Sequence, residues 1–135
     1  MIKMFLILLA YFNCNEFESI NCIGYNVQIP VEIEFKLEKD QYTEGVFYDY
    51  IFKDYSTLTI HCGYNVYRPF KTNISLTDTF QINDVDVIKY LGKNNSREFI
   101  EHFYLNSKIT VIAEFEKPDS YSADLIEKVK IIKDR

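Results

Sequence analysis

The residue types that most often do chemistry are thinly spread along this chain of 135 residues. Two histidines are present, His61 and His102. Glu98 and His102 are four residues apart, so on a helix they would share one face and could bind a metal ion, although a solvated ion pair is the commoner use of this spacing. His61 and Cys62 are neighbours in a strand pattern and point to opposite faces, so they cannot act together, and His61 is expected at the surface.

Asn83, Asp84 and Asp86 begin like a calcium-binding loop. The glycine and the closing glutamate of such a loop do not follow at the required positions, which favours a cap or a turn. The sequence also has no glycine-rich phosphate loop and no serine nucleophile motif. We therefore expect no enzyme activity, no cofactor and no metal.

Composition and charge narrow the class of protein further. The formal net charge is −5, and the basic residues are spread among carboxylates, whereas a nucleic-acid-binding domain needs a basic stripe. Glycine and proline are scarce, and eleven Tyr and eleven Phe demand burial, which excludes collagen-like and disordered chains. We expect one globular domain that does not bind nucleic acid.

The N-terminal segment has the arrangement of an export signal. Residues 4–12 are apolar and follow a single cation, Lys3, and the run is shorter than the ~20 residues of a permanent membrane span. Cys14, directly after the run, resembles the lipid-accepting cysteine of bacterial envelope lipoproteins. Residues 11–13 depart from the small residues that usually precede that cysteine. The resemblance covers about fifteen residues and implies a signal peptide over residues 1–13, a lipid on Cys14 and anchoring to the membrane at the cell envelope.

A plain secreted protein, or a buried N-terminal strand or helix, is the alternative to the lipoprotein. Residues 14–21 are expected to form a polar tether, and residues 22–135 a single β-rich domain. Cys22 and Cys62 remain as a pair, and in an oxidising compartment a disulfide is their expected fate. Two unpaired buried thiols are the other possibility, because cysteine is a common core residue.

Alternation of apolar and polar residues, typical of half-buried strands, recurs along the domain. It is clearest over residues 27–37, where Pro30 either places the strand at a sheet edge or breaks it. Further strands are expected over residues 46–52, 58–62, 70–82, 109–115 and 129–131. We expect the last two to form a hairpin around the turn at 117–120. Residues 83–104 fit either two short helices or strands.

Six strands with short turns predict a mainly β fold, an antiparallel β-sandwich with room for one or two short helices. The segment Asp40-x-Tyr42-x-x-Gly45, followed by an aromatic strand, is similar to a turn that leads into a strand in many bacterial immunoglobulin-like domains. This resemblance implies an immunoglobulin-like sandwich. It covers about fifteen residues, and Val46 stands where the family usually has an acidic residue.

Eight aromatic residues fall between Phe47 and Phe70, and alternation prevents all of them from pointing into one core. Exposed aromatic side chains supply contact area at interfaces. We select four of them as candidate contact residues: Phe47, Tyr55, Tyr64 and Tyr67. The sequence thus predicts a non-catalytic exported lipoprotein that binds an envelope protein or a glycan. The alternatives are an immunity-type inhibitor of an envelope-acting toxin, whose acidic charge would suit a basic target, and a plain secreted β-domain protein.

Overall fold

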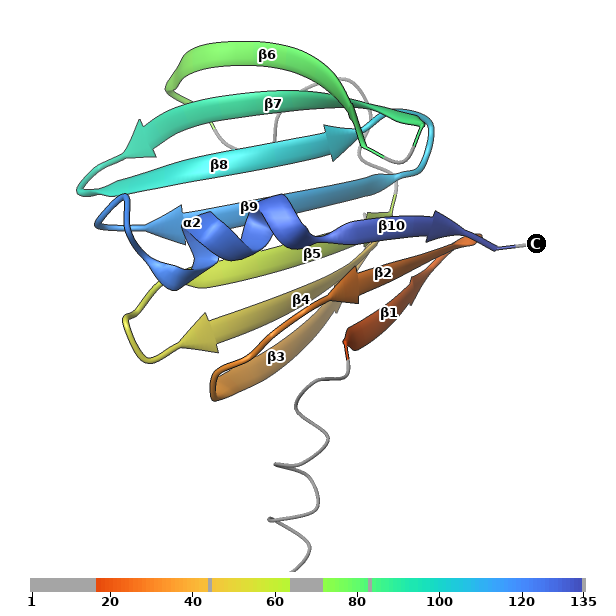
Figure 1. Ribbon diagram of the computed structural model, residues 1–135, viewed down its shortest axis with the longest axis horizontal. Helices are drawn as coiled ribbons and strands as arrows, with labels where there is room; N and C mark the ends of the chain where they lie inside the picture. The colour runs from red at the N-terminus through yellow and green to blue at the C-terminus, as the bar shows by residue number, and fades with distance from the viewer. Residues whose placement is uncertain (1–16, 44, 64–71, 83, 135) are drawn as a thin grey trace, which may run out of the picture.

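The computed structural model describes residues 17–43, 45–63, 72–82 and 84–134. Two antiparallel sheets pack face to face, with one short helical segment beside the smaller sheet (Figure 1). The expected mainly β antiparallel sandwich is confirmed. The expected signal peptide, Cys14, Tyr64 and Tyr67 lie outside the described residues.

The large sheet has seven strands in the order β3-β4-β5-β9-β8-β7-β6, and every neighbouring pair is antiparallel. Its strands are β3 (Phe35–Tyr42), β4 (Gly45–Phe52), β5 (Thr57–Gly63), β6 (Ile74–Ile82), β7 (Val85–Asn94), β8 (Arg97–Tyr104) and β9 (Ile109–Phe115). β9 lies at the centre, and β3 and β6 are the two edge strands. The segment from 85 to 104, which the sequence left open between helix and strand, therefore forms a hairpin of strands.

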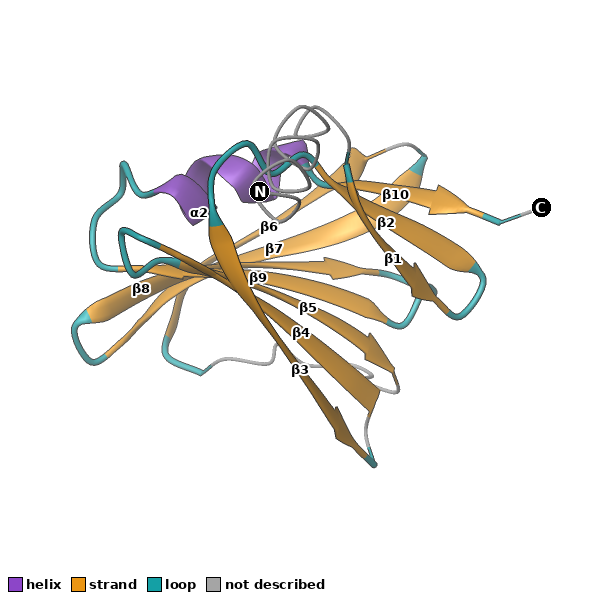
Figure 2. Ribbon diagram, turned by 90° about the horizontal axis from the view of Figure 1, so that it is seen from below, coloured by secondary structure: helices purple, strands orange, loops and turns teal. Residues whose placement is uncertain are grey.

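The small sheet joins the two ends of the domain. Its strands lie in the order β1-β2-β10 and are β1 (Glu18–Cys22), β2 (Tyr25–Ile29) and β10 (Lys130–Lys133). Because β1 begins at Glu18 and pairs with β2, residues 18–21, which the sequence assigns to a tether, belong to the folded part. Figure 2 shows the small sheet over one face of the large sheet, with β3 and β4 extending beyond it.

The expected hairpin of the last two strands is wrong. β9 lies in the large sheet, while β10 pairs with β2 in the small one. Between them, α2 (Tyr121–Leu125) and the 3-10 helix η1 (Ile126–Lys128) carry the chain from one layer to the other. Leu125 and Ile126 are buried, so this helical segment completes the cover over the large sheet.

The long alternating run at residues 27–37 is divided between the two sheets. β2 ends at Ile29, and β3 begins at Phe35. Pro30 follows β2 directly, and because proline has no amide hydrogen it cannot continue the ladder. Of the two predicted alternatives at Pro30, the break is the one found, since β2 lies between β1 and β10 and is not an edge strand.

The main core lies between the sheets. The small sheet contributes Ile20, Val27, Ile29 and Ile131, and the large sheet contributes Tyr50, Leu58, Ile60 and Val111, all buried. A second apolar cluster lies on the opposite face of the large sheet and consists of Tyr90, Phe99, Phe103 and Ile112. The large sheet is therefore buried on both faces around β7, β8 and β9.

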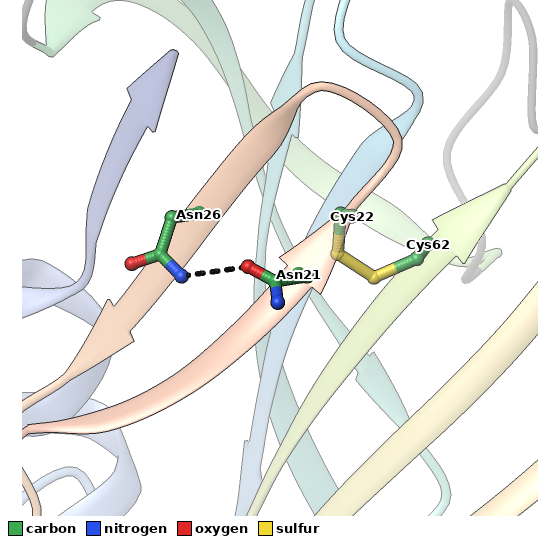
Figure 3. The surroundings of a disulfide bond; sticks show 4 residues. All are labelled: Asn21, Cys22, Asn26 and Cys62. Carbon is green, nitrogen blue, oxygen red and sulfur yellow. Dashed lines mark hydrogen bonds between the residues drawn. A yellow bond between two sulfur atoms is a disulfide. The ribbon is translucent and has the colours of Figure 1, made fainter. Parts of the chain in front are cut away.

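A disulfide between Cys22 and Cys62 joins the end of β1 to β5 and so fastens the two layers together (Figure 3). The two Cα atoms are 5.3 Å apart, and both side chains are buried. This confirms the expected bridge and replaces the alternative of two free thiols. Among the described residues, no helix is long and apolar enough to cross a membrane.

Candidate binding surface

Three aromatic rings lie side by side on the outer face of the large sheet, the face turned away from the small sheet. Phe47 in β4 stacks on His61 in β5, with ring centroids 4.3 Å apart and planes 28° apart. Tyr42, at the end of β3, contacts Phe47 edge to face with centroids 5.5 Å apart. We call Tyr42, Phe47 and His61 the aromatic stack.

The aromatic stack depends on the tight β3–β4 turn. Tyr42 pairs with Gly45, which has a φ of 134°. A Cβ atom added at Gly45 would lie 2.8 Å from the Cα of Gly63 and even closer to the carbonyl of Cys62. Only glycine fits this approach to β5 and this backbone conformation. Close packing against β5 therefore explains the glycine of the Asp40-x-Tyr42-x-x-Gly45 segment.

The rings of the stack differ in exposure. His61 is fully buried beneath Phe47, so the expectation of a surface histidine is wrong, although its predicted face of the strand is right. Phe47 is half-buried, and 56% of Tyr42 is exposed. The stack therefore offers a partner one exposed phenol and the rim of a second ring.

Polar groups surround the stack on the same face. By strand alternation Lys36, Glu38 and Asp40 lie along β3 beside Tyr42, and Lys36 and Glu38 form an exposed ion pair at 3.1 Å. In the next strands, the Thr59 hydroxyl donates to Asp49 at 2.5 Å. A surface with aromatic rings inside a polar rim has the composition of a contact site for a protein or a sugar.

Tyr55 lies at the tip of the β4–β5 turn and is 78% exposed. Its φ is 64°, and its carbonyl oxygen accepts a hydrogen bond from Arg97 Nη2 at 3.0 Å. Asp54, beside it, accepts hydrogen bonds from the amide of Ser56 and from the amide of Tyr121, at 2.9 and 2.8 Å. The backbone that presents Tyr55 is thus held in place, while its ring is free to meet a partner.

Of the four predicted contact residues, the structure describes Phe47 and Tyr55, and it does not bring these two together. Phe47 and Tyr55 lie at opposite ends of β4, which at ~3.3 Å per residue separates them by on the order of 20 Å. Tyr42 was missed by the sequence reasoning. Its signal was its place in the turn segment, because the short β3–β4 turn must set residue 42 beside the aromatic start of β4.

On the inner face, under η1, the buried His102 lies beside two charged side chains that are partly exposed, Lys89 and Glu127. Lys89 in β7 forms an ion pair with Glu127 at 3.2 Å, and Nε2 of His102 in β8 lies 3.8 Å from the same carboxylate oxygen. Phe80 contacts the His102 ring edge to face, with centroids 5.4 Å apart. Because the His102 side chain is 0% exposed, it cannot touch a substrate in this conformation.

Burial controls the protonation of His102 and of its neighbour Tyr104. It lowers the pKa of His102 to about 4, and the Lys89 charge acts in the same direction, while the Glu127 charge opposes both. Burial, together with the Glu127 charge, raises the pKa of Tyr104 well above its ordinary value. At neutral pH, His102 is therefore a neutral imidazole and Tyr104 a neutral phenol.

The spacing of Glu98 and His102 does not create a metal site. Both side chains point to the inner face of β8, but four residues along a strand separate them by roughly 13 Å. Within the described ranges, no group of three or more His, Cys, Asp or Glu side chains is placed to hold a metal ion. The carboxylate beside His102 is instead Glu127, from a distant part of the sequence.

A pocket of about 360 Å³ opens at the other end of the inner face, between the start of β7 and the end of β10. Its lining includes Tyr25, Asp84, Asp86 and Lys133. Asp86 already accepts a hydrogen bond from Gln81 at 3.0 Å. The pocket lies on the opposite face of the large sheet from the aromatic stack and shares no residue with it.

Comparison of the chain with protein-family models, with curated proteins and with solved structures finds no match. What the chain does is therefore inferred from its own residues and their geometry.

Proposed function

We propose that the chain is an exported, non-catalytic binding module, held at the cell envelope by a lipid on Cys14, which binds an envelope protein or a glycan through the outer face of β3 and β4. The observation that carries the binding role is the aromatic stack. Tyr42 and Phe47 present adjoining ring surface on the outer face of the large sheet, where 56% of Tyr42 is exposed. Rigid rings with a polar tip give contact area at a low cost in side-chain entropy.

The disulfide supports the exported location. Bonds such as Cys22–Cys62 form and persist in oxidising compartments and are rare in the cytosol. The first described residue, Phe17, is only three positions after Cys14, so a lipid there would hold the domain close to the membrane surface. The two-layer antiparallel architecture is compatible with an immunoglobulin-like domain, a fold that often carries binding surfaces.

The charge on the same face favours a second candidate function. Exposed Asp40 lies next to Tyr42 on this face, exposed Glu38 lies farther along β3, and the whole chain carries a net charge of −5. An immunity-type inhibitor would use such carboxylates to dock on a basic toxin. In this case the partner would be a single cationic protein, and binding would weaken steeply with salt.

The anchor is tested by fractionating cells that express the wild-type chain and a Cys14→Ser variant, with mass spectrometry of the N-terminal peptide. We expect a lipid-modified peptide in the membrane fraction for the wild type and an unmodified, released product for the variant. An unmodified Cys14 in a soluble wild-type product would rule out the lipid anchor and leave the secreted form.

The binding surface is tested by capture from envelope extracts. Tyr42→Ala is the main variant, because its exposed ring can be removed without opening the core; Phe47→Ala and Tyr55→Ala test the predicted residues. Phe17→Ala is the matched control, since Phe17 is a 46% exposed aromatic residue outside the aromatic stack. We expect the Tyr42 variant to lose at least tenfold in affinity and the control to bind like the wild type. If Tyr42→Ala and Phe47→Ala both bound with the affinity of the wild type, the proposed surface would be refuted.

A further inference from the structure

The two edges of the large sheet are built differently. The edge strand β3 carries four charged residues, Lys36, Glu38, Lys39 and Asp40, which is a common protection against pairing with another strand. The opposite edge strand β6 has nine residues and a single charge, Asp78. Every β6 residue from Ile74 to Thr79 is exposed. A long, exposed and nearly uncharged edge of this kind is a template for an added strand.

The hydrogen-bond pattern shows which backbone groups of β6 point outward. The amide of Leu105 donates to the carbonyl of Asp86, so residue 86 of β7 faces β8. In an antiparallel ladder the direction alternates, so Val87 and Lys89 exchange hydrogen bonds with their β6 partners Phe80 and Asp78.

The β6 residues next to these two partners must therefore turn their amides and carbonyls away from β7. They are Thr77, Thr79 and Gln81. The Thr79 amide confirms this direction, because it donates to the Asp78 carboxylate at 2.9 Å instead of to the ladder. β6 thus turns three alternate residues toward the edge of the sheet, and at the middle one, Thr79, the amide is bonded to Asp78.

We propose that a second copy of this chain occupies this edge, with β6 pairing antiparallel to β6 of its partner about a two-fold axis at Thr79. In this register Thr77 lies opposite Gln81 of the other copy, and Thr79 lies opposite its own equivalent. Each of these pairs exchanges two hydrogen bonds. The sheet then runs without interruption through both copies.

The ends of the β6 segment match each other in this register. The segment 76–82 overlaps completely with itself, and it begins after the register shift between Ile74 and Leu76. On the inner face, Leu76, which is 52% exposed, lies opposite Ile82 of the other copy. Asp78 lies opposite Phe80, so the two Asp78 carboxylates are not directly paired. A two-fold axis requires this kind of match, because the same patch must serve on both sides.

The Asp78 carboxylate opposes association in two ways. It occupies the Thr79 amide at the axis, and in the dimer it meets its equivalent diagonally across the strand pair. Both effects are removed in Asp78→Ala, which should therefore associate more tightly than the wild type. This inference does not depend on the proposed function, because β6 lies at the edge of the sheet opposite to the aromatic stack.

The test is sedimentation equilibrium of the purified full chain in mild detergent, from 1 to 100 µM. We expect a reversible monomer–dimer equilibrium for the wild type and a dissociation constant at least fivefold lower for Asp78→Ala. Thr79→Pro removes an outward amide and should give a monomer. Its matched control is Lys39→Pro, which removes an outward amide on β3 and should leave the dimer intact.

A second pair of variants covers the case in which a proline prevents folding. Leu76→Glu places a carboxylate at the β6 edge and should give a folded monomer, whereas Leu37→Glu, at a 45% exposed position of β3, should still dimerise. A folded wild type that stays monomeric at 100 µM would overturn the proposal. A Leu76→Glu variant that dimerises as well as the wild type would also overturn it. The same holds if a β6 variant and its β3 control, Thr79→Pro with Lys39→Pro or Leu76→Glu with Leu37→Glu, lose the dimer equally.

Discussion

The backbone amide of Tyr121 donates a hydrogen bond to the carboxylate of Asp54 at 2.8 Å, which ties the β4–β5 turn to the first residue of α2. The same carboxylate accepts from the amide and the hydroxyl of Ser56, at 2.9 and 2.6 Å. The hydroxyl of Tyr121 in turn accepts from the amide of Glu32, at 2.8 Å. One turn, one helix and the connection between β2 and β3 are thus linked through two side chains.

Asp54→Ala should therefore lower the free energy of unfolding by about 1–3 kcal/mol, because the amides of Ser56 and Tyr121 lose their acceptor. Partial burial works to raise the pKa of Asp54, but these hydrogen bonds outweigh it and hold the pKa below its ordinary value. Urea denaturation at pH 7 measures the change. Asp119→Ala, at an exposed neighbouring turn position, is the control and should stay within about 0.5 kcal/mol of the wild type. A similar loss in both variants would contradict this role.

Stability should fall as the pH drops from about 6.5 to about 4, because of His102. Burial depresses its pKa to about 4 in the folded chain, whereas the unfolded chain binds the proton near the ordinary value of 6.5. In this window the unfolded state holds more protons, so acid favours unfolding, by up to roughly 3 kcal/mol. Urea titrations at several pH values measure this slope.

His102→Gln is the matched variant for this effect, since it removes the titrating group. Its stability is expected to be lower at pH 7 but to change less between pH 6.5 and 4.5 than that of the wild type. A pH slope as steep in His102→Gln as in the wild type would assign the effect to other groups.

Substitution of the two turn glycines should have unequal effects. In Gly45→Ala the new methyl group would collide with backbone atoms of Cys62 and Gly63, and we expect a loss of about 3 kcal/mol or more. In Gly24→Ala nothing lies within 4 Å of the new Cβ, so only the cost of a φ of 84° remains, about 1 kcal/mol. Thermal denaturation compares them, and equal losses would show that Gly45 does not approach β5 this closely.

Removal of the disulfide should lower the free energy of unfolding by about 3–4 kcal/mol, since it closes a loop with a sequence separation of 40. Cys22→Ala, Cys62→Ala and the double variant should have similar stability, because the bond is lost in each. A reductant should bring the wild type toward the double variant and leave that variant unchanged. Insensitivity of the folded wild type to complete reduction would argue that the bond adds little.

The strands whose two faces differ in polarity were predictable from the sequence, whereas β7 and β8, which carry apolar residues on both faces, were not. Alternation identifies β4 and β5, and Pro30 marks the break before β3. In β7, Val87 is buried on the inner face while Tyr90 is buried on the outer face, so the period of two is lost and helical spacing fits as well. His61 was misplaced for another reason, because Phe47 covers the polar face of β5 at this position.

The layer to which a strand belongs could not be predicted either. β9 and β10 both show clear alternation, and the turn at residues 117–120 between them suggested a hairpin, but α2 carries the second strand to the other sheet. Only part of the aromatic stack was predicted from the sequence. Phe47 was selected from its place in an aromatic-rich segment, whereas Tyr42 becomes a neighbour only through the pairing of β3 with β4.

The pairing of β2 with β10 also sets the order of events in folding. Gln28 and Lys130 are partners although more than one hundred residues separate them along the chain. A chain that emerges from a ribosome or a membrane pore N-terminus first can oxidise Cys22 and Cys62 and form the β3–β4–β5 meander early. It cannot close the small sheet over the core until its last strand has emerged. During that interval the inner face of the large sheet is uncovered, and exposed apolar surface of this kind favours aggregation.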